Sequence, residues 1–76
     1  MITVRLYGLL RIESGIKEIR LEANSIKEVF AHLMGCGISG KDLNGCVILI
    51  NGNSANKRSK LKCGDLVILM SPVAGG

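Results

Sequence analysis

The chain has 76 residues, of which 47% are hydrophobic and 21% are charged, and its formal net charge is +4. This length allows one domain near the lower limit for independent folding, and the composition is typical of a globular chain rather than a disordered one. The longest apolar runs, Cys46 to Ile50 and Leu66 to Met70, are five residues long, whereas a membrane-spanning helix needs about 20. The sequence therefore predicts no membrane span.

The first part of the chain reads as two strands. Residues Ile2 to Gly8 alternate between apolar and polar side chains, as in a half-buried strand, and Ile16 to Glu22 alternate again. The stretch Leu9 to Gly15 between them is irregular and ends on a turn signal, so we expect the two strands to pair as an antiparallel hairpin. Because the strand pattern starts directly after Met1, we expect no signal peptide and a cytoplasmic protein.

A helix is predicted next. Ser25 and Glu28 form a capping box, in which the serine and glutamate side chains satisfy backbone N–H groups at the start of a helix. The following apolar residues recur with helical spacing on one face: Ile26, Val29, Phe30, Leu33 and Met34. Glycines at 35 and 37 are suitable stops for this helix. Because it is the only helix expected, it should cover one face of the sheet and leave the other at least partly exposed.

The second half should supply the remaining strands. The segment Gly37 to Gly45 is predicted as a loop, too rich in glycine for a second helix. Val47 to Ile50 reads as a strand, Asn51-Gly52 as a hairpin turn, and Asn53 to Asn56 as a weak edge strand. Leu66 to Met70 is the last strand, and both continuous apolar strands are expected in the middle of the sheet with some cover on both faces.

This order of elements predicts an α+β fold of the ubiquitin-like β-grasp type, with one main helix packed on a mixed four- to five-stranded sheet. A ferredoxin-like arrangement is the alternative, and it would need a second helix. We expect residues 1–70 to form the domain and residues 71–76 to form a flexible C-terminal tail.

Three cysteines, Cys36, Cys46 and Cys63, show no C-x-x-C pairing, which argues against a disulfide framework and a zinc site. Cys46 should be a small core residue, and the other two should lie in turns. No metal or bound cofactor is expected. The chain also shows no paired carboxylates, no Ser/His/Asp set and no phosphate-binding glycine loop, so we expect that it is not itself an enzyme.

The tail is the most informative segment. Pro72 cannot continue a central strand, and it biases Ser71 toward extended backbone. Gly75 and Gly76 lack Cβ atoms, so their backbone fits a slot too narrow for other residues. A terminal carboxylate on such a tether is suited to being reached and activated inside another protein's active site.

The basic loop allows a different interpretation. Four cations fall between Lys57 and Lys62, and a cationic patch of this kind also occurs in nucleic-acid-binding proteins. Single-strand binders add stacking aromatic residues, but the chain has only Tyr7 and Phe30, and Phe30 is assigned to the core. We therefore expect no nucleic acid partner, and we interpret the loop as solvated or as steering an acidic partner enzyme.

Several segments resemble the MoaD/ThiS family of ubiquitin-like sulfur carriers. They are Tyr7-Gly8-Leu9-Leu10-Arg11, Asn51-Gly52, Leu61-Lys62-Cys63-Gly64-Asp65 and Pro72-Val73-Ala74-Gly75-Gly76. The resemblance covers the length of the chain and is most specific in the tail. The exit from the first strand and the proline before Val-Ala-Gly-Gly are most similar to the small subunit of molybdopterin synthase.

The resemblance implies a chemistry for the tail. The Gly76 carboxylate would be adenylated by a MoeB- or ThiF-type enzyme that uses ATP, and sulfur from a cysteine desulfurase or rhodanese-type donor would convert it to a thiocarboxylate. Pro72, Val73, Ala74 and Gly75 would thread into the partner. The acceptor would be an enzyme such as the large subunit of molybdopterin synthase. A thiamine-pathway carrier and a ubiquitin-like modifier that forms isopeptides are the alternatives.

The exposed sheet face is the expected docking surface, with Tyr7, Leu9, Leu10 and Arg11 at its edge as candidate contacts. Replacing Tyr7 or Leu10 with Asp should weaken partner binding without unfolding the domain. A simple interaction module with an incidental tail is the remaining alternative, and it predicts that removal of Gly75-Gly76 would leave every function intact.

Overall fold

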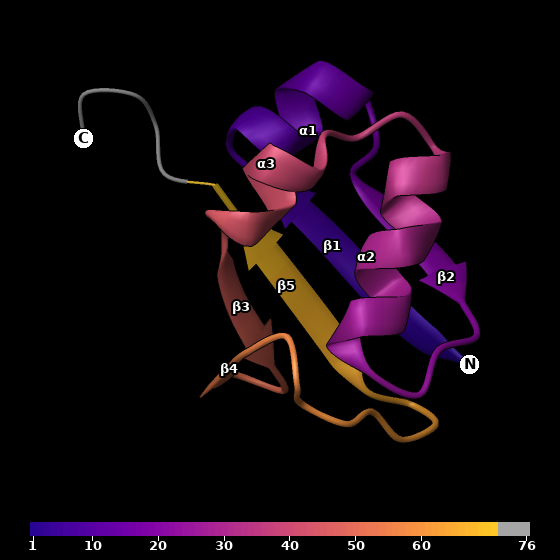
Figure 1. The fold of residues 1–76 in the computed structure, drawn as a ribbon. Coiled ribbons are helices and arrows are strands. Elements are labelled where there is room, and N and C mark those ends of the chain that lie inside the picture. The colour runs from indigo at the N-terminus through magenta and orange to yellow at the C-terminus, as the bar shows by residue number, and fades with distance from the viewer. Residues whose placement is uncertain (72–76) are drawn as a thin grey trace.

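The structure is a computed structural model that describes residues 1–71. It contains five strands in one sheet and three helices (Figure 1). In chain order the elements are β1 (Ile2–Tyr7), α1 (Leu9–Ser14), β2 (Glu18–Leu21), α2 (Ile26–Gly35), α3 (Gly40–Asn44), β3 (Val47–Ile50), β4 (Asn53–Ala55) and β5 (Leu66–Met70).

The sheet has the strand order β2-β1-β5-β3-β4, so the last strand of the chain lies at its centre. The pair β1 and β5 is parallel, and the other neighbouring pairs are antiparallel. A mixed five-stranded sheet with α2 as the main helix confirms the predicted β-grasp fold. Both predicted hairpins, β1 with β2 and β3 with β4, are present.

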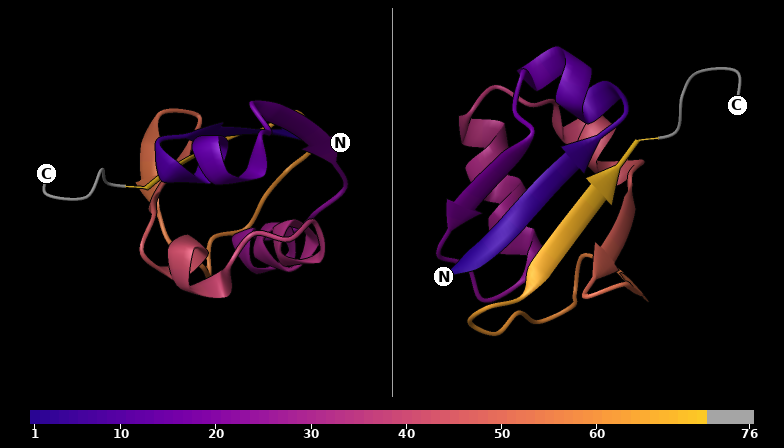
Figure 2. Two further views of the ribbon diagram at one scale, coloured as in Figure 1. Left: turned by 90° about the horizontal axis from the view of Figure 1, so that it is seen from above. Right: turned by 180° about the vertical axis from the view of Figure 1, so that it is seen from behind.

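The core lies between one face of the sheet and the helices α2 and α3 (Figures 1 and 2). Four of the five predicted helix positions are buried in it, Ile26, Val29, Phe30 and Leu33, and they pack with alternate residues of β1 and β5. The prediction was wrong for Met34, which is 48% exposed. Met34 lies at the margin of the apolar stripe, and the buried Leu33 and Ile38 close this end of the core instead.

Two short helices replace segments that were predicted as irregular. The helix α1 follows β1 directly and ends at Gly15, whose left-handed backbone closes the last turn by donating its N–H to the Arg11 carbonyl at 2.9 Å. The helix α3 lies inside the glycine-rich segment that was predicted as a loop. Its first turn is capped by Ser39, whose hydroxyl accepts the Lys41 N–H at 3.2 Å.

Only one face of the central strands is covered, which corrects the expectation that both faces have some cover. In β5, Val67 and Leu69 are fully buried toward the helices, whereas Met70 is 42% exposed. In β3, Ile48 is buried and Val47 is 49% exposed. The view from behind shows β1 and β5 in front of α2, and none of the helices within residues 1–71 crosses that side (Figure 2, right).

None of the helices in residues 1–71 has the length and apolar character needed to cross a membrane.

Candidate functional site

The open face of the sheet carries an apolar patch at the carboxyl end of β5. We call it the open-face patch, and it consists of Tyr7, Val47, Leu49, Ile68 and Met70. The strand register brings these side chains together, because Met70 pairs with Tyr7 on one side and with Val47 on the other, and Ile68 pairs with Leu49. Each alternates along its strand with a residue buried toward the helices. Contiguous exposed apolar surface of this kind marks interaction sites in soluble proteins.

A charged pair borders the open-face patch. Arg5 precedes Tyr7 on the same side of β1, and its Nε donates to Glu18 Oε1 of β2 at 2.8 Å. This hydrogen bond to Glu18 raises the pKa of the Arg5 guanidinium. An apolar centre with a polar rim is the usual anatomy of a protein interface.

The residue that ends the described chain is fixed beside this patch. Ser71 is 7% exposed, and its Oγ accepts the backbone N–H of Leu10 at 3.1 Å in a buried hydrogen bond. Its own N–H donates to the Tyr7 carbonyl at 3.5 Å. We call Ser71 and these contacts the tail root. Ser71 was predicted as the first residue of the tail, but these contacts make it part of the folded domain.

Gly8 makes the close approach at the tail root possible. Its backbone has φ 68° and ψ −142°, a conformation that other residues adopt at high cost. A Cβ atom at this position would lie 2.4 Å from the Ser71 carbonyl oxygen. The Gly8 carbonyl also accepts the N–H groups of Arg11 and Ile12, both at 3.1 Å, so this glycine begins α1 as well. Sequence reasoning quoted Gly8 only within a resembling segment and missed this role.

Three of the four predicted docking residues are at least partly exposed, and the fourth is buried in the core. Tyr7 belongs to the open-face patch, Leu9 is half-buried, and Arg11 is exposed. The prediction of a docking contact was wrong for Leu10, because this side chain is 1% exposed and belongs to the core. A Leu10 to Asp change would bury a charge, so the expectation that it leaves the domain folded was wrong.

The predicted reacting and threading residues, Gly76, Gly75, Ala74, Val73 and Pro72, lie outside the described residues. The structure places their point of attachment, at the end of the central strand and next to the open-face patch.

Asp65 is a structural residue that the sequence did not single out beyond its place in a resembling segment. It is 8% exposed, and its carboxylate accepts the Lys62 N–H at 2.8 Å and the Asn51 side-chain amide at 3.0 Å. The bond from the Lys62 N–H, together with the Asn51 bond, lowers the pKa of the Asp65 carboxyl. Asn51 Oδ1 in turn accepts the Leu66 N–H, so this pair fixes the turn that leads into β5.

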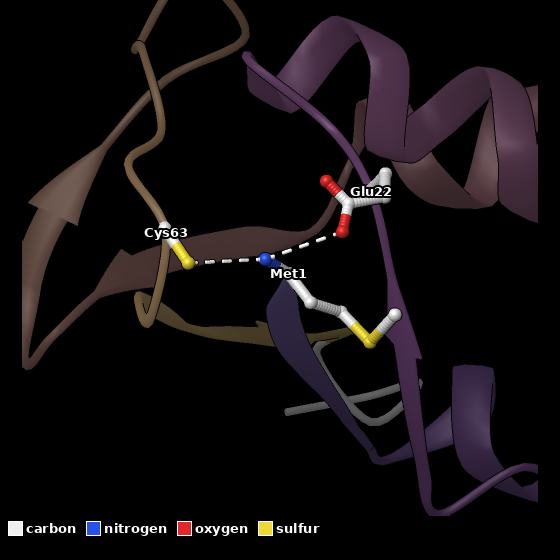
Figure 3. A network of polar contacts seen from close by, with 3 residues as sticks. All are labelled: Met1, Glu22 and Cys63. Carbon is white, nitrogen blue, oxygen red and sulfur yellow. Dashed lines mark hydrogen bonds and ion pairs between the residues drawn. The ribbon is translucent and has the colours of Figure 1, made fainter.

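The three cysteines occupy unlike environments. Cys46 is half-buried, and burial raises the pKa of its thiol. Cys36 and Cys63 are exposed in turns, as predicted. Cys63 Sγ lies 3.2 Å from the Met1 ammonium, which also lies 3.3 Å from Glu22 Oε1 (Figure 3). The hydrogen bonds to Cys63 and Glu22 raise the pKa of the Met1 amine.

Across residues 1–71, no group of three or more His, Cys, Asp and Glu side chains is arranged to hold a metal ion. The features of this region are the open-face patch and the tail root.

Comparisons with known proteins agree with this description. A model of the ThiS family matches residues 4–76. The chain is 30% identical to a chain in the complex of subunits 1 and 2 of the molybdopterin-converting factor from Helicobacter pylori, covering 99% of this chain and 97% of that chain with a TM-score of 0.73. A comparison with curated protein sequences gives no match.

Two more distant structures share the fold. SAMP1 from Haloferax volcanii is 20% identical with a TM-score of 0.84, covering 99% of this chain and 98% of that chain. A chain of the BexX/CysO complex from Amycolatopsis orientalis is 17% identical with a TM-score of 0.73, covering 100% of both chains.

Proposed function

The chain belongs to the ThiS family of ubiquitin-like sulfur carriers, and on this premise we propose that Gly76 carries sulfur as a thiocarboxylate for molybdopterin biosynthesis. The observation that carries the proposal is the position of the tail root. Ser71 is fixed at the end of the central strand and beside the open-face patch. For a partner bound to the patch, the last five residues would therefore start from a defined point, Ser71.

Three steps would load the sulfur. The Gly76 carboxylate attacks the α-phosphorus of ATP within a partner enzyme of the MoeB or ThiF type, and pyrophosphate leaves. The resulting acyl adenylate is a good electrophile. The terminal sulfur of a donor persulfide attacks its carbonyl carbon, AMP leaves, and a C–S bond replaces the C–O bond. A thiol then attacks the donor sulfur of the acyl disulfide, which releases the thiocarboxylate and leaves the donor thiol and the attacking thiol joined as a disulfide. The partner supplies the catalysis, and this chain acts as its co-substrate. The donor would be a cysteine desulfurase or a rhodanese-type protein.

The tail would deliver sulfur in a second complex. The Helicobacter pylori relative is found in a complex of the two subunits of a molybdopterin-converting factor, which supports a large-subunit acceptor of that kind. Pro72, Val73 and Ala74 would line the path into the acceptor, and Gly75 would give clearance for the thiocarboxylate. The soft sulfur nucleophile then attacks an electrophilic carbon of the bound precursor, and the leaving group of that carbon departs as the new C–S bond forms. Hydrolysis of the thioester bond to Gly76 leaves the sulfur on the precursor and returns the Gly76 carboxylate, without release of sulfide to the solvent.

The proposal is tested by reconstitution. The full chain is incubated with an adenylating enzyme of the MoeB type, ATP and sulfide, and pyrophosphate release and thiocarboxylate formation are measured. The wild type should yield both products, and a variant that lacks Gly76 should yield neither. A variant that keeps full thiocarboxylate formation without Gly76 would contradict the proposal, and so would a wild type that forms a lysine isopeptide but no thiocarboxylate.

A second pair of variants tests the docking surface. Met70→Asp adds a charge to the open-face patch, so it should raise KM for the adenylating enzyme with a smaller change in kcat. Ile12→Asp is the matched control, because Ile12 is 76% exposed on α1, outside the patch. Equal effects of the two changes would refute the docking role of the patch.

A further inference from the structure

A recessed surface lies on the side of the sheet that carries α2 and α3, opposite the open-face patch. It is a groove of about 680 Å³ between α2 and the loop of residues 56–60. Its apolar lining comes from α2, namely Phe30, Ala31 and the half-exposed Met34. This groove has no part in the function proposed above.

The rim of the groove is cationic. Lys27 of α2 and the loop residues Lys57, Arg58 and Lys60 are exposed and line it, and no carboxylate within residues 1–71 does. The ion pairs found within residues 1–71 involve none of these four side chains. The nearest acid on α2, Glu28, is turned toward the start of the helix, where its Oε2 accepts the Asn24 N–H at 3.2 Å. The groove therefore has a local positive excess without internal neutralisation.

The cationic loop is already held in place. Its Ser59 carbonyl accepts the Ile26 N–H at 3.0 Å, and the Leu61 N–H donates to the Asn24 carbonyl at 2.8 Å. On the other side Lys57 Nζ donates to Asn44 Oδ1 of α3 at 2.8 Å. Because the walls are fastened to α2 and α3, binding in the groove would lose little backbone entropy.

We propose that this groove binds an acidic segment of a partner protein that inserts an aliphatic side chain between its charges. Carboxylates of such a segment would meet Lys57, Arg58 and Lys60, and an aliphatic side chain would contact Met34, whose flexible thioether adapts to irregular partners. A single-stranded nucleic acid fits less well. It would need an exposed aromatic ring for stacking, and Phe30 is only 5% exposed. The groove and the open-face patch lie on opposite sides, so one partner can occupy each.

The probe is a short synthetic peptide in which pairs of glutamates alternate with single leucines, added to the isotope-labelled full chain at low salt. Amide NMR signals of Ala31, Met34 and Arg58 should shift, and a fluorescent form of the peptide gives the Kd. The Lys57→Gln/Arg58→Gln variant should bind about five- to tenfold more weakly, as expected for two surface charge contacts. Lys17→Gln/Arg20→Gln is the matched control, since it removes the same charge away from the groove.

Three results would overturn the proposal. Equal weakening in both double variants would show a net-charge effect only. Shifts confined to the open-face patch would place the peptide there instead. Tighter binding of a thymidine oligonucleotide than of the peptide, with shifts at the same three amides, would assign the groove to nucleic acid. Because none of these measurements uses the tail or an adenylating enzyme, their failure is independent of the sulfur-carrier proposal.

Discussion

The close approach of Gly8 to Ser71 at the tail root predicts a loss of stability for Gly8→Ala. Gly8 has a positive φ of 68°, and an added Cβ would lie 2.4 Å from the Ser71 carbonyl oxygen. That oxygen belongs to backbone that is held by the buried bond from the Leu10 N–H to Ser71 Oγ. The clash therefore cannot be relieved by rotating a side chain, and either α1 or the end of β5 must move.

The size of the effect follows from two costs. An alanine in this backbone region costs about 1–3 kcal/mol, and forced displacement of packed atoms adds about 1–3 kcal/mol. The lower entropy of the unfolded alanine variant offsets about 0.4–1 kcal/mol. Taking the middle of each range, we expect Gly8→Ala to lower the free energy of unfolding by about 3 kcal/mol. For a domain of this size, each 1 kcal/mol lowers the Tm by roughly 4–8 °C.

Gly15→Ala is the matched control, because Gly15 also has a positive φ, of 74°, but nothing lies within 4 Å of its added Cβ. It should cost no more than about 1–2 kcal/mol, the price of left-handed backbone alone. Urea and thermal unfolding of both variants measure the difference. If Gly8→Ala is no less stable than Gly15→Ala, the contact with Ser71 does not hold the tail root.

Further changes separate core, electrostatic and docking roles. Leu10→Ala should lower the free energy of unfolding by about 2–5 kcal/mol because it opens a core cavity. Arg11→Ala, at the exposed neighbouring position, should change it by less than about 0.5 kcal/mol. Similar urea midpoints for the two variants would contradict the burial of Leu10. Asp65 has a lowered pKa in the folded state, so its stabilisation is present above its unfolded pKa of about 4 and is lost as the pH falls through the folded value. The difference in free energy of unfolding between wild type and Asp65→Asn, measured in urea titrations, should therefore narrow from about pH 7 to about pH 2. A difference that stays constant over this range would refute the stabilising role of the Asp65 carboxylate. Val47→Asp should weaken binding to the adenylating enzyme at an unchanged Tm, and unchanged affinity in calorimetry would remove Val47 from the docking surface.

The strands and the main helix could be predicted because each carries a complete local pattern. Strict alternation identified β1 and β2, and the Ser25 capping box with its apolar stripe identified α2. The helix α1 has no such pattern. It is six residues long, begins at a glycine that offers no capping side chain, and leaves Ile12 76% exposed.

The sequence of α3 does contain a pattern typical of a helix start, although the glycines of this segment led to the prediction of a loop. Ser39 and Asp42 occupy the N-cap and N3 positions, and the buried Ile38 and Leu43 stand at the two positions that form a hydrophobic staple. This local pattern was stronger evidence for a helix turn than Gly40 was against one.

The candidate site was predictable in part. The continuous apolar runs in β3 and β5 were read as strands covered on both faces, whereas the outward residues Val47 and Met70 are exposed. An apolar run does not distinguish cover by the chain's own helices from cover by a partner. The close approach of Gly8 to Ser71 and the bond from the Leu10 N–H to Ser71 Oγ join residues more than 60 apart in sequence, and local patterns contain no information on such contacts.

The most direct test of the sulfur-carrier account is the intact mass of the protein purified from its own cells, with fragmentation to locate any change. The account predicts a fraction of molecules in which one oxygen of the Gly76 carboxylate is replaced by sulfur. Fragmentation is essential, because oxidation of one of the three methionines or three cysteines has nearly the same mass. A branched adduct that joins Gly76 to a lysine would show a conjugating modifier instead. An unmodified carboxylate that also fails to react with an adenylating enzyme, ATP and sulfide would contradict the account.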